Sequence, residues 1–263
     1  MPERTVTSAD GTALACRHSG HGSPMVLVHG ANGDIDTFAL IEGLLAERHT
    51  VWVYSRRGRG GSGDAPDYTL EREVDDVVAV LAAAGDRPHL FGHSGGAMYS
   101  VLAAMRRPSL RSLLLYEPPL HLDRLETSVV DAMQASLDAD DPDRALELLF
   151  PAVGVLAAEV QVLRSIEAVW ERLRAGVRLV PRELRTGFEA IDRLERLDPP
   201  DIPQLYLYGE ATDAPVFALP DDVPELLPKA QLHGLAGQRH LAFAFDPVSV
   251  AQAVLEFASA HDG

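Results

Sequence analysis

Short, almost entirely apolar runs alternate along most of the chain with longer segments of helical spacing. The runs at residues 24–28 and 49–54 have the length and composition of strands buried on both faces, and further expected strands follow at residues 88–91, 110–116, 204–208 and 231–233. Between them apolar residues recur three or four positions apart, as in Leu70, Val74, Val77, Val78 and Leu81. This alternation predicts an α/β fold, a mostly parallel sheet flanked by helices.

The two ends of the chain extend this pattern. Residues 5–7 and 13–16 alternate around the pair Asp10–Gly11, which is typical of a hairpin between two antiparallel edge strands. Thr69 is placed to cap the helix that starts at residue 70, and Asp246 precedes Pro247 as the predicted N-cap of a last helix. We therefore expect the C-terminal helix to close one flank of the sheet.

Residues 120–199 interrupt the rhythm of strands and helices. This segment lacks strand-like runs, carries many charges and has helical spacing, as in Ile166, Val169, Trp170 and Leu173. We interpret it as an inserted helical cap on a core formed by residues 1–119 and 200–263. Trp170 is the cap residue that we expect to reach a substrate.

Charge and cysteine content exclude several classes of protein. The formal net charge is −16, whereas nucleic acids and anionic membranes are bound through clustered Lys and Arg. Cys16 is the only cysteine, so no intrachain disulfide or cysteine-zinc cluster can form. The first residues lack the apolar core of a signal peptide, and no run has the length of a membrane span. We expect a cytoplasmic protein with no nucleic-acid or membrane partner, and the sequence is compatible with a homo-oligomer.

The candidate nucleophile is Ser94. It lies in the sequence Gly-His-Ser-Gly-Gly, residues 92–96, between an apolar run and a helical segment. A tight strand-to-helix turn of this kind holds a serine hydroxyl above the edge of the sheet, and the helix behind it offers free N–H groups. A glycine-rich turn with an incidental serine is the simpler alternative.

Two further segments supply what a serine nucleophile needs. His240 follows the last predicted strand on a loop that contains glycine, and it is the candidate general base. Gly30 and Gly33 flank the end of another buried strand, so the N–H groups of Ala31 and Gly95 are candidates for an oxyanion hole. We find no histidine pair with zinc-ligand spacing and a carboxylate, and we expect neither a metal nor a cofactor.

The order of these motifs resembles the α/β-hydrolase superfamily. The resemblance rests on residues 29–30, residues 55–62, residues 92–96 and His240, and it covers nearly the whole chain. It implies an α/β-hydrolase fold and a Ser–His–acid triad with Ser94 as the nucleophile. Ser55 departs from the pattern, because many relatives have an aspartate there.

The acid of the triad remains open between two residues. Glu117 follows a predicted strand and precedes two prolines, whereas Asp213 lies after a later strand, one residue beyond its place in most of the superfamily. Zearalenone-lactone hydrolases and some haloalkane dehalogenases use a glutamate where Glu117 stands. We favour Glu117 and keep Asp213 as the alternative.

These observations predict a cofactor-independent serine hydrolase of the carboxylesterase or lactonase type, which cleaves an ester or lactone of a small apolar molecule through an acyl-enzyme. Asn32, Met98 and Trp170 are the expected substrate contacts. Two alternatives remain: a non-hydrolytic enzyme of the same fold, for C–C or cyanohydrin cleavage or perhydrolysis, and a ligand-sensing receptor that keeps the triad.

Overall fold

The computed structural model describes residues 3–106, 109–189, 198 and 201–262. Its centre is an eight-stranded sheet with the strand order β1-β2-β4-β3-β5-β6-β7-β8. The strands are β1 (Glu3–Thr7), β2 (Ala13–Gly20), β3 (Ser23–Val28), β4 (His49–Tyr54), β5 (His89–His93), β6 (Ser112–Tyr116), β7 (Gln204–Gly209) and β8 (Ala230–Leu235). From β4 to β8 all neighbouring strands are parallel, whereas β2 pairs antiparallel with both β1 and β4. The predicted fold class is confirmed.

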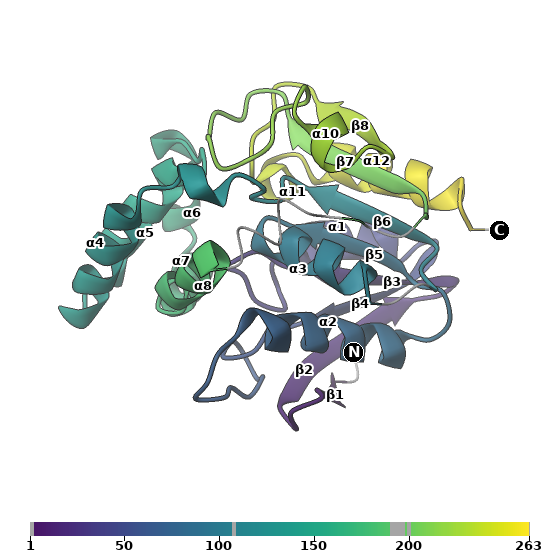
Figure 1. The fold of residues 1–263 in the computed structure, drawn as a ribbon, viewed down its shortest axis with the longest axis horizontal. Coiled ribbons are helices and arrows are strands. Elements are labelled where there is room, and N and C mark those ends of the chain that lie inside the picture. Colours follow the sequence, from purple (N-terminus) through teal and green to yellow (C-terminus); the bar gives the residue numbers. More distant parts are fainter. Residues whose placement is uncertain (1–2, 107–108, 190–197, 199–200, 263) are drawn as a thin grey trace.

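Helices cover both faces of this sheet (Figure 1). The helices outside the insertion are α1 (Ala39–Leu45), α2 (Leu70–Ala84), α3 (Gly95–Ala104), α10 (Val223–Leu226), α11 (Ala242–Phe245) and α12 (Pro247–Ser259). Helices α2 and α3 share one buried apolar cluster with the sheet, and α1, α11 and α12 share another on the opposite face. The central strands are therefore covered on both faces, as their nearly continuous apolar runs predict.

The predicted helix caps are present. The Thr69 side chain accepts a hydrogen bond from the Arg72 N–H at the start of α2, and Asp246 accepts one from the Ser249 N–H at the start of α12. Each satisfies one of the N–H groups that a first helical turn leaves free.

The insertion between β6 and β7 is helical. It contains the short 3-10 helix η1 (Leu122–Arg124) and the helices α4 (Thr127–Asp138), α5 (Pro142–Ala152), α6 (Ala157–Ser165), α7 (Glu167–Val177) and α8 (Val180–Glu189). These helices form a separate group beyond one edge of the sheet in Figure 1. We refer to α4–α8 as the cap. The predicted cap boundary at residue 199 lies outside the described residues.

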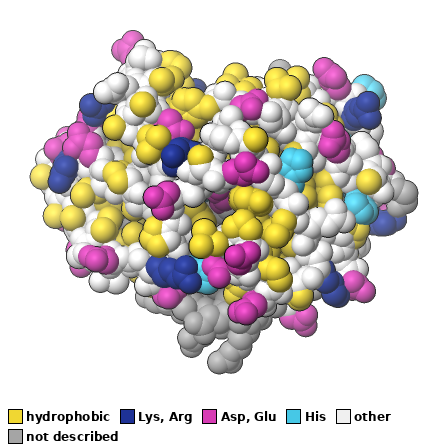
Figure 2. Space-filling view, turned by 90° about the horizontal axis from the view of Figure 1, so that it is seen from above, with side chains coloured by type: hydrophobic (Ala, Val, Ile, Leu, Met, Phe, Trp, Pro, Cys, Tyr) yellow, Lys and Arg dark blue, Asp and Glu magenta, His cyan; other side chains and the backbone are white. Residues whose placement is uncertain are grey.

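The surface shows the acidic character of the chain. On the face in Figure 2, Asp and Glu side chains are scattered widely, while Lys and Arg form small separate groups. Within the described ranges, no helix combines the length and the apolar character needed to cross a membrane.

Candidate active site

Ser94 occupies the turn between β5 and α3, at the edge of the sheet where the parallel strands end. Its backbone has φ 55° and ψ −128°, a conformation that costs a non-glycine residue free energy. The neighbouring glycine leaves room for this turn, because a Cβ on Gly96 would collide with the backbone oxygens of Val28 and His29. The Ser94 N–H donates to the Tyr116 carbonyl at 2.9 Å. This is the strained turn that the sequence of residues 92–96 predicts.

Glu117 and His240 are in direct contact beside this turn. The His240 Nδ1 lies 2.7 Å from the Glu117 Oε2, and the other carboxylate oxygen accepts the Gly209 N–H at 2.7 Å. Glu117 and His240 are only 1% and 3% exposed. Glu117 follows β6 directly and has a positive φ of 44°. Its carboxylate reaches Gly209 at the end of the neighbouring strand β7. The contact leaves the second ring nitrogen of His240, Nε2, without a partner in the described part of the chain.

Three aromatic residues that sequence reasoning missed hold His240 in place. The Phe217 ring stacks on the imidazole with centroids 4.3 Å apart. The His93 Nε2 is 2.9 Å from the His240 carbonyl oxygen, and the Tyr116 hydroxyl donates to the carbonyl of Arg239. Burial, and then the neighbouring His240, lower the pKa of His93 well below its usual value, so His93 is neutral and donates from Nε2. His93 lies inside the serine motif, which gave a signal for it, but Phe217 lies in no motif.

Asp213 lies elsewhere. It is exposed on the loop after β7, and among the described residues it makes no contact with His240. Of the two candidate acids, the structure therefore brings Glu117 to the imidazole.

The two candidate oxyanion donors lie on neighbouring stretches of backbone. A Cβ built on Gly95 would lie 3.7 Å from the Ala31 nitrogen. Within the described part of the chain neither N–H donates a hydrogen bond. Both residues line a cavity together with Ser94.

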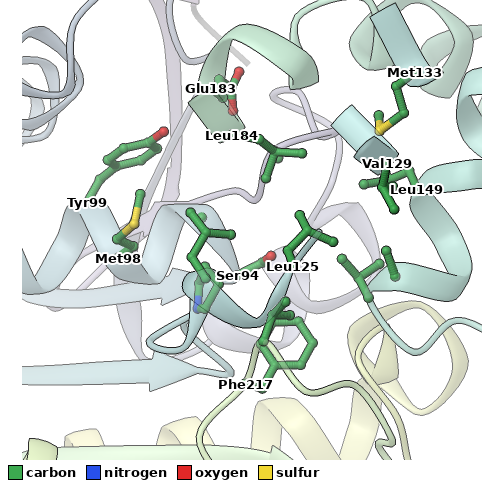
Figure 3. A pocket seen from close by; sticks show the side chains of 17 residues that line it. Ser94, Met98, Tyr99, Leu125, Val129, Met133, Leu149, Glu183, Leu184 and Phe217 are labelled. Atoms are coloured by element: carbon green, nitrogen blue, oxygen red, sulfur yellow. The ribbon is translucent and has the colours of Figure 1, made fainter. Parts of the chain in front are cut away.

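Two cavities meet at Ser94. The smaller one, of about 50 Å³, is almost wholly apolar and is shown in Figure 3. Met98, Leu125, Val129 and Phe217 are among the side chains that surround it there. The larger one, of about 390 Å³, is lined by Ser94 and His240 and by residues of the loop before α1, of α6 and of α7. A substrate carbonyl at Ser94 could therefore extend one part into each cavity.

The three predicted substrate contacts have different outcomes. Met98 lines the small cavity. Asn32 lines the large one, and both polar atoms of its side-chain amide are buried without a protein partner in the described ranges. Trp170 reaches neither of these cavities: it packs in the cap interior, and its indole N–H donates to Asp143 at 2.8 Å. The apolar stripe of α7 packs against other cap helices, and a substrate contact of Trp170 stays a prediction.

One group of side chains has donors suitable for a metal ion. Among the described residues, His49, His89 and Asp262 each place one such atom within 4.8 Å of the others. They lie at the opposite edge of the sheet, where strands begin, and Asp262 Oδ1 already contacts the His89 Nε2 at 3.0 Å. The candidate active site itself is formed by hydroxyl, imidazole, carboxylate and backbone N–H groups.

Comparisons with known proteins find similar sequences and similar folds. A model of the "Alpha/beta hydrolase family" matches residues 25–253. A solved alpha/beta hydrolase from Sphaerobacter thermophilus is 30% identical and superposes with a TM-score of 0.83 over 97% of this chain and 100% of that one. The esterase RhEst1 from Rhodococcus sp. is 24% identical, with a TM-score of 0.76 over 99% of this chain and 100% of that one, which shows a shared fold.

A sequence relative with a stated activity is N-formylmaleamate deformylase from Pseudomonas putida. It is 35% identical over 108 residues, which are 40% of each chain. The chain thus covers less than half the length of this curated relative.

Proposed function

Because the chain belongs to the alpha/beta hydrolase family, we propose that it is a serine hydrolase that cleaves an ester or lactone bond of a small apolar molecule without a cofactor. The observation that carries this proposal is the buried contact between Glu117 and His240, 2.7 Å long, beside a serine in a strained turn. In this arrangement one ring nitrogen is held by the acid, and the other is left for the serine.

The roles follow from what each group can donate or accept. Ser94 Oγ attacks the carbonyl carbon and gives its proton to His240 Nε2, while Glu117 stabilises the imidazolium. The carbonyl oxygen becomes negative and accepts the Ala31 and Gly95 N–H groups, each worth roughly 3 kcal/mol of the barrier. His240 then protonates the leaving alkoxide, and the C–O bond breaks to give an acyl-enzyme. A water molecule, deprotonated by His240, then attacks the acyl-enzyme. The bond to Ser94 breaks, Ser94 takes the proton back from His240, and the carboxylic acid product leaves.

The cavities indicate the kind of substrate. The small cavity is narrow and apolar, so it suits a short acyl chain, and the large one has room for a bulkier alcohol portion. Esterases among the proteins of similar fold support an ester substrate. In a lactone the alkoxide and the acyl group stay joined, so a ring would have to occupy both cavities at once.

A panel of esters tests the proposal. Purified protein is assayed with acetate, butyrate and hexanoate esters of one alcohol and with several lactones, and Ser94→Ala serves as the blank. We expect turnover of short acyl esters, and we expect Ser94→Ala to lower kcat by more than about 10³-fold while it keeps the fold.

An organophosphonate that modifies serine nucleophiles separates the alternatives. Labelling of Ser94 together with ester turnover supports the hydrolase. Labelling without turnover of any ester or lactone would instead favour a ligand-sensing receptor or a non-hydrolytic enzyme, and the absence of both would contradict the assignment of Ser94 as a nucleophile.

A further inference from the structure

A buried network of charges links the cap to the loop that carries Ala31. The guanidinium of Arg56 is paired with Glu73 of α2 at 2.7 Å and with Glu183 of the cap helix α8 at 3.0 Å. Arg59 also donates to Glu183. The four side chains are at most 4% exposed. Two arginines and two glutamates balance each other, so every charge in this buried region depends on its partners.

The same two arginines hold the backbone next to the candidate oxyanion hole. Arg56 Nη1 donates to the Gly30 carbonyl at 3.2 Å, and Arg59 Nη2 donates to the Ala31 carbonyl. The Gly30 carbonyl and the Ala31 N–H belong to one planar trans peptide and point in opposite directions. The Gly30 carbonyl also accepts the Gly33 N–H at 3.2 Å and lies 2.9 Å from the His29 Nδ1. Together with these groups, Arg56 holds the carbonyl on the side of the network, which leaves the Ala31 N–H on the opposite side of the peptide.

Glu183 is the member of this network that the cap supplies. Within the described residues it is the one carboxylate that pairs with Arg59, whose Nε and Nη1 have no partner there, whereas Arg56 also has Glu73. Glu183 also lines the small cavity beside Ser94, and Figure 3 shows its side chain there. Without the charge of Glu183, Arg59 would be buried and unpaired. Its guanidinium would then move toward water and release the Ala31 carbonyl.

We propose that Glu183 is a positioning residue: through Arg56 and Arg59 it helps to fix the peptides on both sides of Ala31, so that the Ala31 N–H is held in place to bind the oxyanion. This inference rests on the proposed function. It makes the cap a part of the catalytic machinery as well as a wall of the substrate cavities. Since the oxyanion exists only in the transition state, the loss of this positioning lowers kcat and leaves KM nearly unchanged.

A simple charge effect makes the opposite prediction, which makes the inference testable. Replacing Glu183 by a neutral residue removes a negative charge near Ser94, and by Coulomb's law alone the remaining positive charge would stabilise an oxyanion and raise kcat. Positioning predicts a lower kcat. The sign of the change therefore decides between the two.

The experiment compares Glu183→Gln with Glu183→Asp in the full chain. We expect the glutamine variant to lower kcat about 10- to 100-fold with KM within about twofold, since losing one oxyanion donor completely costs about 10²- to 10³-fold. The aspartate variant keeps the charge and should recover part of the rate. Glu171→Gln, which removes an exposed cap carboxylate paired with Arg174, is the matched control and should leave kcat unchanged.

Thermal unfolding of each variant identifies a loss of fold. If the glutamine variant does not fold, the aspartate variant carries the test, with an expected kcat below that of the parent and an unchanged KM. An unchanged or higher kcat in a folded Glu183 variant would overturn the inference, and so would a change confined to KM.

The rate of phosphonate labelling separates this inference from the proposed function. The phosphoryl oxygen occupies the same oxyanion site, so labelling of Ser94 should slow in Glu183→Gln even if the parent turns over no ester. Labelling of Glu183→Gln at the parental rate would contradict the positioning role of Glu183 and leave the proposed hydrolase unaffected. A parent that neither labels nor turns over ester would contradict the proposed hydrolase.

Discussion

The two edges of the sheet carry the same kinds of side chain in different arrangements. At the edge where strands end, Ser94 lies near His240, which contacts Glu117. At the edge where strands begin, Ser112 lies next to His89, which contacts Asp262. Each edge thus brings together a hydroxyl, an imidazole and a carboxylate.

The difference lies in what each imidazole has left to offer. At the starting edge the His89 Nδ1 is 2.7 Å from the Ser112 hydroxyl and its Nε2 is 3.0 Å from Asp262, so both ring nitrogens are occupied. At the ending edge one nitrogen of His240 is held by Glu117, and the residue borders a cavity of about 390 Å³. We call each hydroxyl–imidazole–carboxylate set a row. The comparison teaches that such a row is a candidate for catalysis only where one ring nitrogen of the imidazole is open to a substrate.

Replacing the acid at the ending edge should have the largest effect. In Glu117→Gln the side chain can still accept the Gly209 N–H, but its amide NH2 would face the His240 Nδ1 and favour the wrong tautomer of the ring. We expect kcat/KM for an ester to fall about 10³- to 10⁴-fold. Steady-state kinetics on the preferred ester measure the change.

Asp213→Asn is the matched control, because Asp213 is the alternative acid and is exposed in the structure. It should leave kcat/KM within about twofold of the parent. A collapse of activity in Asp213→Asn with near-parental activity in Glu117→Gln would reverse the assignment of the acid.

Much of this ending edge could be predicted from the sequence, because local features determine it. The glycines around Ser94 and the apolar runs before Glu117 and His240 mark the ends of strands, and a parallel sheet brings such ends to one edge. The choice between Glu117 and Asp213 depended on loop conformations that a sequence pattern does not determine.

Contacts between distant segments were harder to predict. Phe217 stacks on His240 from a loop without a motif, and Glu183 meets Arg59 across 124 positions of sequence. The helical apolar stripe that contains Trp170 does not say which neighbour it faces, and in the structure it packs in the cap interior. These contacts depend on tertiary packing, for which the chain carries no local signal.

The closed row at the starting edge should make stability depend on pH. Burial lowers the pKa of His89 to about 4, whereas an unfolded histidine titrates near 6.5. As the pH falls below about 6.5 the unfolded chain binds a proton that the folded chain refuses, so stability decreases until the pH reaches about 4. This one group should account for a loss of up to about 3 kcal/mol. Urea unfolding between pH 7 and 4, with a chelator present, measures it.

His89→Gln should remove only the His89 share of this decrease, because the buried His29, His49 and His93 also have lowered pKa values and keep the remainder. His233→Gln, at an exposed position on β8, should preserve the whole decrease. An identical pH dependence in the parent and in His89→Gln would show that the starting edge is not a closed, neutral row.

The smallest expected effect concerns the open space at the ending edge. Val129 lines the small cavity and Val162 the large one, so the same Val→Phe change can be made in each. If the small cavity holds the acyl chain, Val129→Phe should lower kcat/KM for a hexanoate ester about tenfold relative to the acetate ester, because the added ring takes the space of the distal methylenes. Val162→Phe should leave that ratio unchanged and instead disfavour bulkier alcohols. The ratio of kcat/KM values across the ester panel measures both changes, and a shift in acyl preference produced by Val162→Phe alone would mean that the two cavities exchange roles.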